Sequence, residues 1–285
     1  MTFTKRTNTV RSREGFARRY GPWALVAGAS EGLGAAYARA LARRGLALVL
    51  VARRRPLLDR LGDELRRSFG VDVHCLAGDL ADRAFLETVQ VECRGLDVGL
   101  LVYNATHAPI GGFTQLDPED LMGVVDVNMR APVNLLRAFL PAMTQRGRGG
   151  VILMTSLAGN QGSPKIATYA ASKAFTRVLA EGLWCELKDQ GIDVVACCAG
   201  AVRTPGYTGA AVGKEAPGTL DPDDVVEQAL RALGRGPVVI PGRVNRIASS
   251  FMTRLLPRRT AISIMARNTA DLDPQAPGPP GEEIS

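Results

Sequence analysis

The sequence has few aromatic residues and only two histidines, and it contains no long apolar run. No apolar stretch approaches the ~18 residues that a membrane-spanning helix needs, and the basic N-terminus lacks the apolar segment of a secretory signal. The five cysteines show neither a CxxC motif nor the Cys/His spacing of a zinc site, so we expect reduced cysteines and no metal site. These absences predict a cytoplasmic protein, with at most a peripheral contact with a membrane.

Acidic residues are missing from one stretch near the C-terminus. Between Gln228 and Ala270 there are eight arginines and no Asp or Glu, in a chain whose formal net charge is +7. Such a stretch favours an acidic partner, such as a phosphorylated carrier or an anionic membrane surface, although it is also typical of a solvated basic surface. Nucleic acid is not an expected partner, because the chain has no recognisable nucleic-acid module and only 5% aromatic residues.

Short apolar runs alternate with longer amphipathic stretches over most of the chain. The runs are apolar at nearly every position, as strands buried on both faces must be, and they predict strands at 23–29, 46–52, 71–77, 97–103, 150–156, 192–198 and 237–241. Helices are predicted between them at 33–44, 56–68, 82–92, 118–145, 167–189 and 222–234. Asp117 and Asp221, each followed by proline, are the expected N-caps of two of these helices. The alternation predicts an α/β fold: a doubly wound, parallel seven-stranded sheet with helices on both faces.

The chain divides into one folded domain and two terminal segments. We predict a flexible basic arm over 1–20, a single α/β domain over 21–270 and a disordered Pro/Gly-rich tail over 271–285. Within the domain, the Gly-rich stretch 205–220 predicts a mobile loop, and 243–268 predicts amphipathic helices. One helical face of this last stretch is apolar and could pack in the core, cover a pocket, form a dimer surface or touch a membrane. Its residues are Ile247, Phe251, Leu255 and Leu256.

A glycine-rich turn follows the first predicted strand. Its sequence, GASEGLG, lies between an apolar strand and an Ala-rich helix. Such a turn lets the backbone approach a pyrophosphate, which the N–H groups and the positive dipole of the following helix then bind, as in a Rossmann fold. We therefore predict that a dinucleotide binds to Gly28, Ser30, Gly32, Leu33 and Gly34.

The end of the second strand bears on which nicotinamide dinucleotide binds. In NAD sites an Asp or Glu there binds the ribose 2′-OH, but this strand ends in Ala52-Arg53-Arg54-Arg55. A guanidinium can hold a 2′-phosphate, and Ser30 could add a hydrogen bond. We therefore favour NADP(H) over NAD(H) and assign the phosphate to Arg53 ahead of Arg54 and Arg55, although these arginines could also simply face water.

A serine, a tyrosine and a lysine stand close together around the fifth strand. Ser156 ends that strand, Tyr169 follows 13 residues later, and Lys173 lies four residues beyond Tyr169 in a predicted helix. The four-residue spacing places Tyr169 and Lys173 on one helix face. Because doubly wound sheets bind their ligands at the carboxyl ends of the strands, this phenol and this ammonium are a candidate acid–base pair.

These motifs occur in the order found in the short-chain dehydrogenase/reductase family, which the sequence resembles from Gly28 to Thr204. The matching features are the GxxxGxG turn, Asp79, Asn104-Ala105, Asn128, Ser156, the YxxxK motif of Tyr169 and Lys173, and AGAVRTP at 199–205. The stretch RYGPWALVAGASEGLGAAYARALARRG further resembles the branch of 3-ketoacyl-CoA reductases and 17β-hydroxysteroid dehydrogenases. The resemblance implies a single-domain Rossmann fold that binds its cofactor through the glycine turn and through Asp79, Leu80, Asn104, Ala105, Tyr169, Lys173, Gly200, Val202 and Thr204.

The resemblance also implies a mechanism. Tyr169 would protonate the nascent alkoxide as a hydride reaches the carbonyl carbon, and Ser156 would bind the carbonyl oxygen. Lys173 would bind the nicotinamide ribose and lower the pKa of Tyr169. Asn128 would anchor a water in a proton relay. Because Pro132 has no N–H, it would leave the main-chain carbonyl of Asn128 open to that water, or it would only bend the helix.

Two positions depart from the family pattern, and both lie next to expected cofactor contacts. Thr106 replaces the glycine of an Asn-Ala-Gly motif, and Ala199 replaces the proline of a Pro-Gly motif. Neither change removes a reactive group, but both put the seating of the cofactor in question. His107 follows directly and could line the substrate entrance or simply be exposed.

The sequence as a whole predicts an NADP(H)-dependent oxidoreductase that interconverts a ketone and a secondary alcohol on a lipophilic substrate, with Tyr169 as the general acid/base. A steroid-like ketone and a 3-oxoacyl thioester of CoA or of a carrier protein both suit apolar helices beside arginines, with 205–220 as the substrate loop. The alternative is a non-catalytic NADP(H) sensor, or an interaction protein that uses its basic surface. By analogy with the family we expect a homodimer or a homotetramer.

Overall fold

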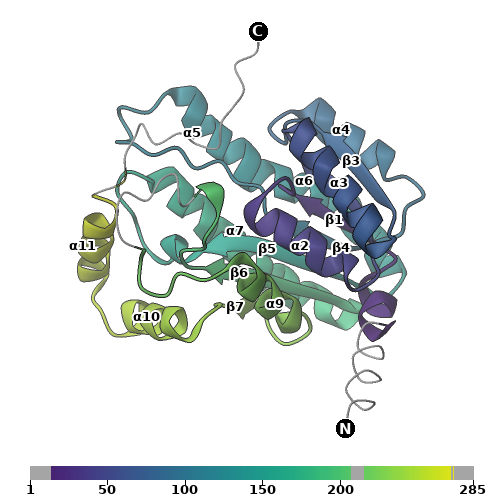
Figure 1. The fold of residues 1–285 in the computed structure, drawn as a ribbon. Coiled ribbons are helices and arrows are strands. Elements are labelled where there is room, and N and C mark those ends of the chain that lie inside the picture. Colours follow the sequence, from purple (N-terminus) through teal and green to yellow (C-terminus); the bar gives the residue numbers. More distant parts are fainter. Residues whose placement is uncertain (1–13, 207–214, 271, 273–285) are drawn as a thin grey trace.

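Seven parallel strands form one sheet in the order β3-β2-β1-β4-β5-β6-β7 (Figure 1). The computed structural model describes residues 14–206, 215–270 and 272. The strands are β1 (Trp23–Ala27), β2 (Ala47–Ala52), β3 (Val73–Ala77), β4 (Val98–Tyr103), β5 (Gly149–Ser156), β6 (Ile192–Ala199) and β7 (Val238–Val239). The strand order reverses between β1 and β4, so the predicted doubly wound α/β fold is confirmed.

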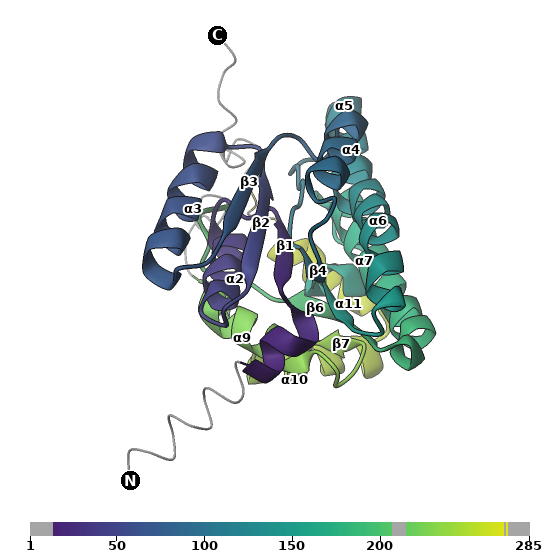
Figure 2. The same ribbon diagram turned by 90° about the vertical axis from the view of Figure 1, so that its right-hand side faces the viewer.

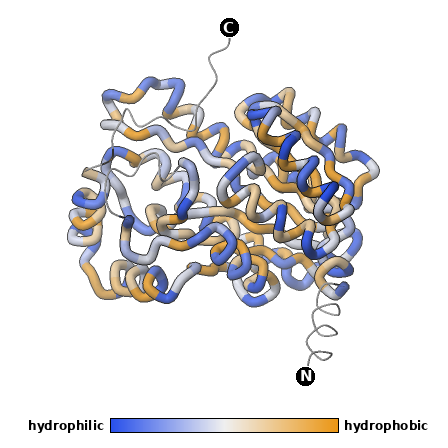
Figure 3. Tube along the Cα trace, viewed as in Figure 1, coloured by the Kyte–Doolittle hydropathy of each residue, from blue (hydrophilic) through white to orange (hydrophobic). Residues whose placement is uncertain are grey.

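The strands are apolar throughout because helices cover both faces of the sheet. Alternate residues of a strand face opposite sides: Ala24 and Val26 of β1 pack in one core cluster, whereas Leu25 and Ala27 pack in the other. The first cluster lies under α2 (Gly32–Ala42), α3 (Arg55–Phe69) and α9 (Pro222–Ala232), and the second lies under α4 (Arg83–Glu92), α6 (Ala131–Gln145) and α7 (Ala167–Leu187). Figure 2 shows these two helix layers on opposite sides of the sheet, and Figure 3 shows polar and apolar residues alternating along the helices.

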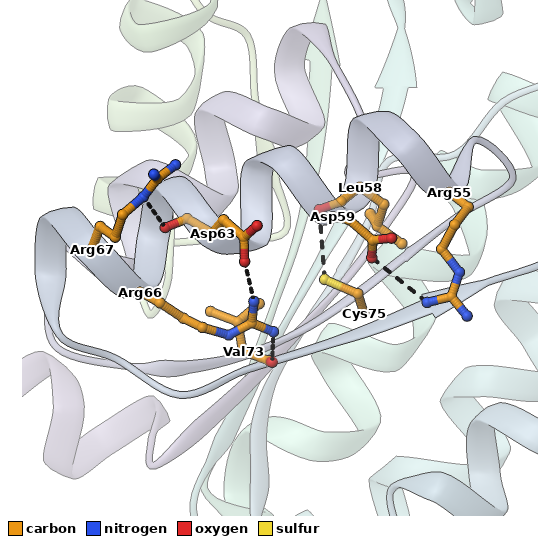
Figure 4. Close-up of polar contacts among 8 residues, drawn as sticks. All are labelled: Arg55, Leu58, Asp59, Asp63, Arg66, Arg67, Val73 and Cys75. Carbon is orange, nitrogen blue, oxygen red and sulfur yellow. Dashed lines mark hydrogen bonds and ion pairs between the residues drawn. The ribbon is translucent and has the colours of Figure 1, made fainter.

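The edge strand β3 is fastened to α3 by polar contacts (Figure 4). The guanidinium of Arg66 donates to the carbonyl of Val73 at 2.5 Å and to the carboxylate of Asp63 at 2.9 Å. At the start of the same helix, Arg55 pairs with Asp59 four residues on, at 3.6 Å. Arg66 therefore links α3 to β3, and Arg55 forms its ion pair within α3.

The helix predicted over 118–145 follows one continuous path that contains an irregular turn. α5 (Pro118–Val125) leads into a π-helical turn at Asp126–Arg130 and then into α6. The N–H of Ala131 accordingly bonds to the carbonyl of Asp126, five residues back instead of four. Pro132, the second residue of α6, has no N–H with which to continue the hydrogen-bond ladder of the helix. The helix is therefore irregular around Asn128, which lies in the middle of the turn.

Both predicted Asp N-caps begin their helices, but only one of them makes a side-chain capping bond. The side chain of Asp117 accepts a hydrogen bond from the N–H of Glu119 at 3.1 Å, which caps α5 as expected. Asp221 is the N-cap residue of α9, as predicted, but its side chain makes no capping hydrogen bond. Its carboxylate instead accepts from the guanidinium of Arg203 at 2.9 Å.

The described part of the N-terminal segment is not a flexible arm. Residues 14–20 are helical, and the guanidinium of Arg19 and the hydroxyl of Tyr20 donate to the carboxylate of Asp193 on β6 at 3.0 and 2.8 Å. The folded domain therefore begins before residue 21, where the sequence analysis placed its start. The ion pair with Asp193 on β6 attaches this helical turn to the sheet. Residues 1–13, half of the predicted loop (207–214) and nearly all of the tail (271 and 273–285) lie outside the described residues.

Two helices follow β7 and pack beside the carboxyl end of the sheet. They are α10 (Arg243–Arg254) and α11 (Arg258–Asn268). The amide of Asn160, which follows β5, donates to Ser249 of α10 at 3.1 Å, and Arg258 at the start of α11 donates to the carbonyl of Asn160 at 2.6 Å. Within the described ranges, none of the helices is both long and apolar enough to cross a bilayer.

Candidate active site

The glycine turn after β1 is closed so tightly that side chains are excluded at all three glycines. Gly28 and Gly32 have φ angles of +80° and +54°, a region that L-residues with side chains seldom adopt. A Cβ on Gly28 would lie 2.6 Å from the Cα of Ala105, and one on Gly34 would lie 1.9 Å from the carbonyl oxygen of Gly28. At the start of α2, Glu31 provides no side-chain cap. The turn therefore presents bare backbone and a helix N-terminus, which suits an anionic group.

The arginines after β2 take three different positions. Arg54 donates to the hydroxyl of Ser30 at 3.3 Å and pairs with Glu31 at 2.6 Å, so its guanidinium lies at the glycine turn. Arg53 is exposed and pairs with none of the residues that the structure describes, and Arg55 is paired with Asp59. Arg53 was predicted ahead of Arg54 as the residue that binds the 2′-phosphate. In the structure it is Arg54 that lies beside Ser30, the other residue predicted to contact this phosphate.

The segment after β4 is tied to the glycine turn. The side-chain amide of Asn104 donates to the carbonyl of Gly28 at 3.0 Å, and the N–H groups of Asn104 and Ala105 both donate to the carbonyl of Ala27. Asn104 therefore joins the end of β4 to the glycine turn that follows β1. Thr106 is exposed, and its φ is not positive, so the loss of the family glycine brings no backbone strain.

The other two segments of the predicted cofactor site also end near this edge of the sheet. After β3, Asp79 is exposed and accepts from the N–H of Ala81 at 2.9 Å, while Leu80 is buried. After β6, Val202 pairs with Leu220 in an isolated bridge, and Thr204 lies next to Gly32. A Cβ on Gly32 would in fact lie 3.0 Å from the Cγ2 of Thr204. Gly200 has a separate reason to lack a side chain, because a Cβ there would lie 2.8 Å from the amide nitrogen of Asn245 on α10.

Ser156, Tyr169 and Lys173 meet at the carboxyl end of β5. Ser156 is the last residue of β5, and Tyr169 and Lys173 lie on one face of α7 with the Lys173 Nζ 5.4 Å from the centre of the Tyr169 ring. Lys173 is buried, and its Nζ donates to the carbonyl of Met154 on β5 at 3.2 Å. The three residues predicted from spacing are thus brought together.

Burial sets the acid–base properties of the pair. It raises the pKa of Tyr169 above its ordinary value of 10.0, and a hydrogen bond with Ser156 opposes that rise. Burial also lowers the pKa of Lys173 from 10.5 to about 8. The expectation that Lys173 lowers the pKa of Tyr169 is therefore not met in the cofactor-free protein. The reason is that desolvation disfavours the tyrosinate and is the largest influence on this pKa.

Asn128 is a buried junction between the loop after β4 and α7. Its Oδ1 accepts from the N–H of His107 at 2.8 Å, and its Nδ2 donates to the carbonyl of His107 at 2.9 Å and to the hydroxyl of Ser172 at 3.0 Å. That hydroxyl donates in turn to the carbonyl of Tyr169 at 2.7 Å. Asn128 therefore fixes the backbone beside the tyrosine, and a water on its main-chain carbonyl stays a prediction.

Several supporting residues were missed by the sequence analysis. The hydroxyl of Thr155 donates to the carbonyl of Lys173 at 2.7 Å, which joins β5 to α7 next to the pair. Gly159 allows the same contact, because a Cβ there would lie 2.7 Å from the backbone nitrogen of Ala174. His107 was named from the sequence, as lining the substrate entrance or exposed, but its partner was not: it is partly buried and pairs with Asp120 of α5 at 3.1 Å. Small hydroxyl residues and a lone glycine have no distinctive spacing, so nothing in the sequence singles them out.

Comparison with known proteins agrees with this geometry. A model of the short chain dehydrogenase family matches residues 22–211. The 7beta-hydroxysteroid dehydrogenase of Clostridium sardiniense is 30% identical over 233 residues, which are 81% of this chain and 89% of that protein. The very-long-chain 3-oxoacyl-CoA reductase of Neurospora crassa is 37% identical over 185 residues, which are 62% of this chain and 56% of that protein.

A solved structure extends the likeness to three dimensions. The structure of a short-chain dehydrogenase from Sphingobium yanoikuyae in complex with NADPH has a TM-score of 0.73 and 34% sequence identity, and the match covers 83% of this chain and 97% of that one. The two relatives named above represent both groups that the N-terminal stretch resembles, a hydroxysteroid dehydrogenase and a 3-oxoacyl-CoA reductase. The chain therefore belongs to the short-chain dehydrogenase family and is an NAD(P)-dependent oxidoreductase.

Proposed function

We propose that this oxidoreductase uses NADP(H) to interconvert a ketone and a secondary alcohol on a lipophilic substrate, either steroid-like or a 3-oxoacyl thioester. The observation that carries the proposal is the meeting of Ser156, Tyr169 and Lys173 at the end of β5. The neighbouring strand end, Ala199, pairs with Ser156 in the sheet, and the segment that follows it reaches the glycine turn at Thr204. The names of the relatives supply the two substrate classes.

The raised pKa of Tyr169 suits the direction of ketone reduction. A phenol that stays protonated at neutral pH is ready to donate, and an alkoxide is a much stronger base than a phenolate, so the proton moves downhill once the alkoxide forms. Ser156 donates a hydrogen bond to the same oxygen and stabilises its developing charge. The cofactor, when bound, supplies the hydride, and Lys173 holds its ribose. The protonated lysine also opposes the burial penalty on tyrosinate in the reverse direction.

The residues around the glycine turn fit a phosphorylated dinucleotide. Bare backbone at Gly28, Gly32 and Gly34 and the uncapped start of α2 would receive the pyrophosphate. The guanidinium of Arg54 with the hydroxyl of Ser30, and the exposed Arg53, would receive a 2′-phosphate. Asp79, Leu80, Asn104, Ala105, Gly200, Val202 and Thr204 complete the proposed contacts.

The proposed function is tested by a screen of cofactor oxidation. The purified protein is supplied with NADPH or NADH and with steroid ketones, 3-oxoacyl-CoA thioesters, 3-oxoacyl-carrier thioesters and small ketones in turn. We expect turnover with NADPH and with a member of one lipophilic class, and weak or no turnover with small ketones. Equal rates with NADH, or turnover confined to small polar ketones, would contradict the proposal.

Replacing Glu31 with glutamine is expected to tighten NADPH binding about three- to tenfold and to leave NADH binding nearly unchanged. In the structure Glu31 pairs with Arg54 at 2.6 Å, so an incoming 2′-phosphate must displace a carboxylate that also repels it. The two affinities are measured by fluorescence titration. Asp59→Asn is the matched control, because it frees Arg55 from an equivalent partner without reaching the turn. An equal change for both cofactors would show that Arg54 does not bind the 2′-phosphate.

Alcohol oxidation and ketone reduction are expected to depend differently on pH. Because burial raises the pKa of Tyr169, reduction should persist through neutral and mildly alkaline pH, whereas oxidation needs tyrosinate and should rise with pH over the same range. Ser156 opposes the rise in that pKa, so Ser156→Ala should move the oxidation profile to higher pH in addition to lowering its rate. Both profiles are measured as kcat against pH. An unmoved profile in Ser156→Ala would mean that the observed ionisation is not that of Tyr169.

A further inference from the structure

The helix α10 buries polar side chains and exposes several large apolar ones. The residues that it buries include Asn245, which donates to the carbonyls of Gly218 and Pro241, and Ser249, which accepts from Asn160. Four apolar residues lie on its outward side: Val244, Ile247, Phe251 and Leu255 are 55%, 72%, 50% and 71% exposed. Leu256, which the sequence placed on the same face, is partly buried. A helix on a water-exposed surface normally has the opposite arrangement, with its apolar stripe facing the core. The stripe of Val244, Ile247, Phe251 and Leu255, here called the α10 stripe, is thus a surface that favours an apolar environment.

Arginines flank the α10 stripe, and no acid accompanies them. Arg243 and Arg254 lie on the side of the helix away from its buried residues, at 3.6 residues per turn, and both are exposed. Arg258 and Arg259 follow at the start of α11, and the sequence from Ala229 to Ala270 contains no Asp or Glu. The environment that suits this face is therefore apolar and negatively charged at once.

Arginine and apolar side chains are mixed on the surface around the stripe. An open, shallow depression of about 460 Å³ lies along α10, beside Arg246, Ile247, Ser250, Phe251, Arg254 and Leu255. A second hollow of about 280 Å³ lies between α9 and α10 and shares Arg246, with Arg231 and Arg235 on its wall. Ser156, Tyr169 and Lys173 line neither hollow. The apolar and the cationic parts of this face are therefore adjacent and separate from the catalytic trio.

We propose that α10 lies in the interface of an anionic phospholipid bilayer, with the α10 stripe among the acyl chains and the flanking arginines at the lipid phosphates. This is the usual arrangement of an interfacial amphipathic helix, in which apolar burial and attraction to anionic headgroups act together. The polar inward contacts of α10 to Gly218 and Asn160 keep the helix attached to the domain while its other face is in lipid.

A second copy of the chain fits this face less well than a bilayer. In a two-fold contact each residue of the patch meets the same patch of the partner. The arginines of one α10 would then face those of the other, with no acid on either α10 or α11 to separate them. Like charges brought together in this way oppose association. An anionic bilayer reverses the sign of the same interaction.

The test is sedimentation of the full-length protein with phosphatidylcholine vesicles that contain or lack phosphatidylglycerol. We expect binding to the anionic vesicles and little to the neutral ones. Ile247→Gln/Phe251→Gln should weaken binding at least about tenfold through lost apolar burial, and Arg243→Gln/Arg254→Gln about fivefold per arginine. Neutral glutamine leaves the buried Asn245 and Ser249 untouched, and circular dichroism checks that each variant is folded.

Matched controls lie at the opposite edge of the sheet, in α3, in α4 and just after α4 (Figure 1). Val91→Gln removes an apolar side chain that is 48% exposed, and Arg60→Gln/Arg94→Gln removes two exposed arginines. Neither should change vesicle binding. Absence of binding to anionic vesicles, or binding that all variants retain, would overturn the proposal. So would loss of oligomer in Ile247→Gln/Phe251→Gln without any vesicle binding, since the stripe would then contact a second copy.

Discussion

Replacing Tyr169 with phenylalanine is expected to lower kcat by about 10³-fold or more while NADPH binding stays nearly unchanged. Phenylalanine keeps the ring that lies 5.4 Å from the Lys173 Nζ and removes only the hydroxyl. Without that hydroxyl, the alkoxide has no donor in place at the moment when it forms. Ser156 remains and still stabilises the charge on the oxygen, so we expect a residual rate above that of the uncatalysed reaction. The measurement is kcat with the substrate found in the screen, together with a fluorescence titration of NADPH.

Tyr20→Phe is the control for loss of a tyrosine hydroxyl. Tyr20 is as deeply buried as the core and donates to Asp193, but it belongs to the N-terminal helical turn and not to the catalytic end of the sheet. This variant should lose some stability and keep its kcat. If Tyr169→Phe kept its turnover, the assignment of Tyr169 as proton donor would be wrong. If the unmodified protein and Tyr20→Phe both bound NADPH but reduced no carbonyl, the chain would be a dinucleotide sensor.

The sheet and its strand positions were predictable because burial on both faces leaves a strong mark in a sequence. Continuous apolar runs such as the one around β2 can hardly be anything but central strands once their spacing alternates with helices. The irregular turn inside the helix that follows β4 was not predictable in detail. Pro132 predicts an interruption of the helical hydrogen bonds. The π-turn at Asp126–Arg130, however, lies where α5 and α7 pack together, and such tertiary packing cannot be read from the sequence.

The catalytic trio was predictable from order and spacing, and its energetics were not. The spacing of Tyr169 and Lys173 fixes a shared helix face, but it carries no information about desolvation. A lowered pKa was therefore expected for Tyr169, whereas burial raises this pKa. The same limit applies to Arg54, since only the fold brings Glu31 and Ser30 to its guanidinium. Helical spacing likewise marked 243–268 as amphipathic without showing that α10 buries Asn245 and Ser249 and exposes Ile247 and Phe251.

Replacing Lys173 with methionine is expected to remove activity and to stabilise the cofactor-free protein by about 1–3 kcal/mol. Burial lowers the pKa of Lys173 from 10.5 to about 8, so the folded state binds this proton more weakly than the unfolded state does. That difference corresponds to a penalty of about 3 kcal/mol at neutral pH. Methionine keeps most of the side-chain volume and carries no charge. The lost hydrogen bond to the carbonyl of Met154 offsets about 1 kcal/mol of the gain.

The stabilisation should depend on pH in a direction set by linkage. Below about pH 8 both the folded and the unfolded states hold the proton of Lys173, and the penalty is complete. Between pH 8 and 10.5 the folded protein releases this proton while the unfolded chain keeps it. The unfolded state then binds more protons, so the stability of the unmodified protein rises with pH. The advantage of Lys173→Met should therefore shrink across this interval. Urea unfolding at several pH values measures it.

Lys188→Met is the matched control, because Lys188 ends the same helical stretch but is exposed and lies over the Trp184 ring. It should change neither the stability nor the kcat by much. Added NADPH should stabilise the unmodified protein more than Lys173→Met, since the proposed ribose contact compensates the buried ammonium in the complex. Lower stability of Lys173→Met at every pH would show that the bond to Met154 outweighs desolvation. Lys173 would then stabilise the fold. The view that its buried charge costs stability and is kept for catalysis would be wrong.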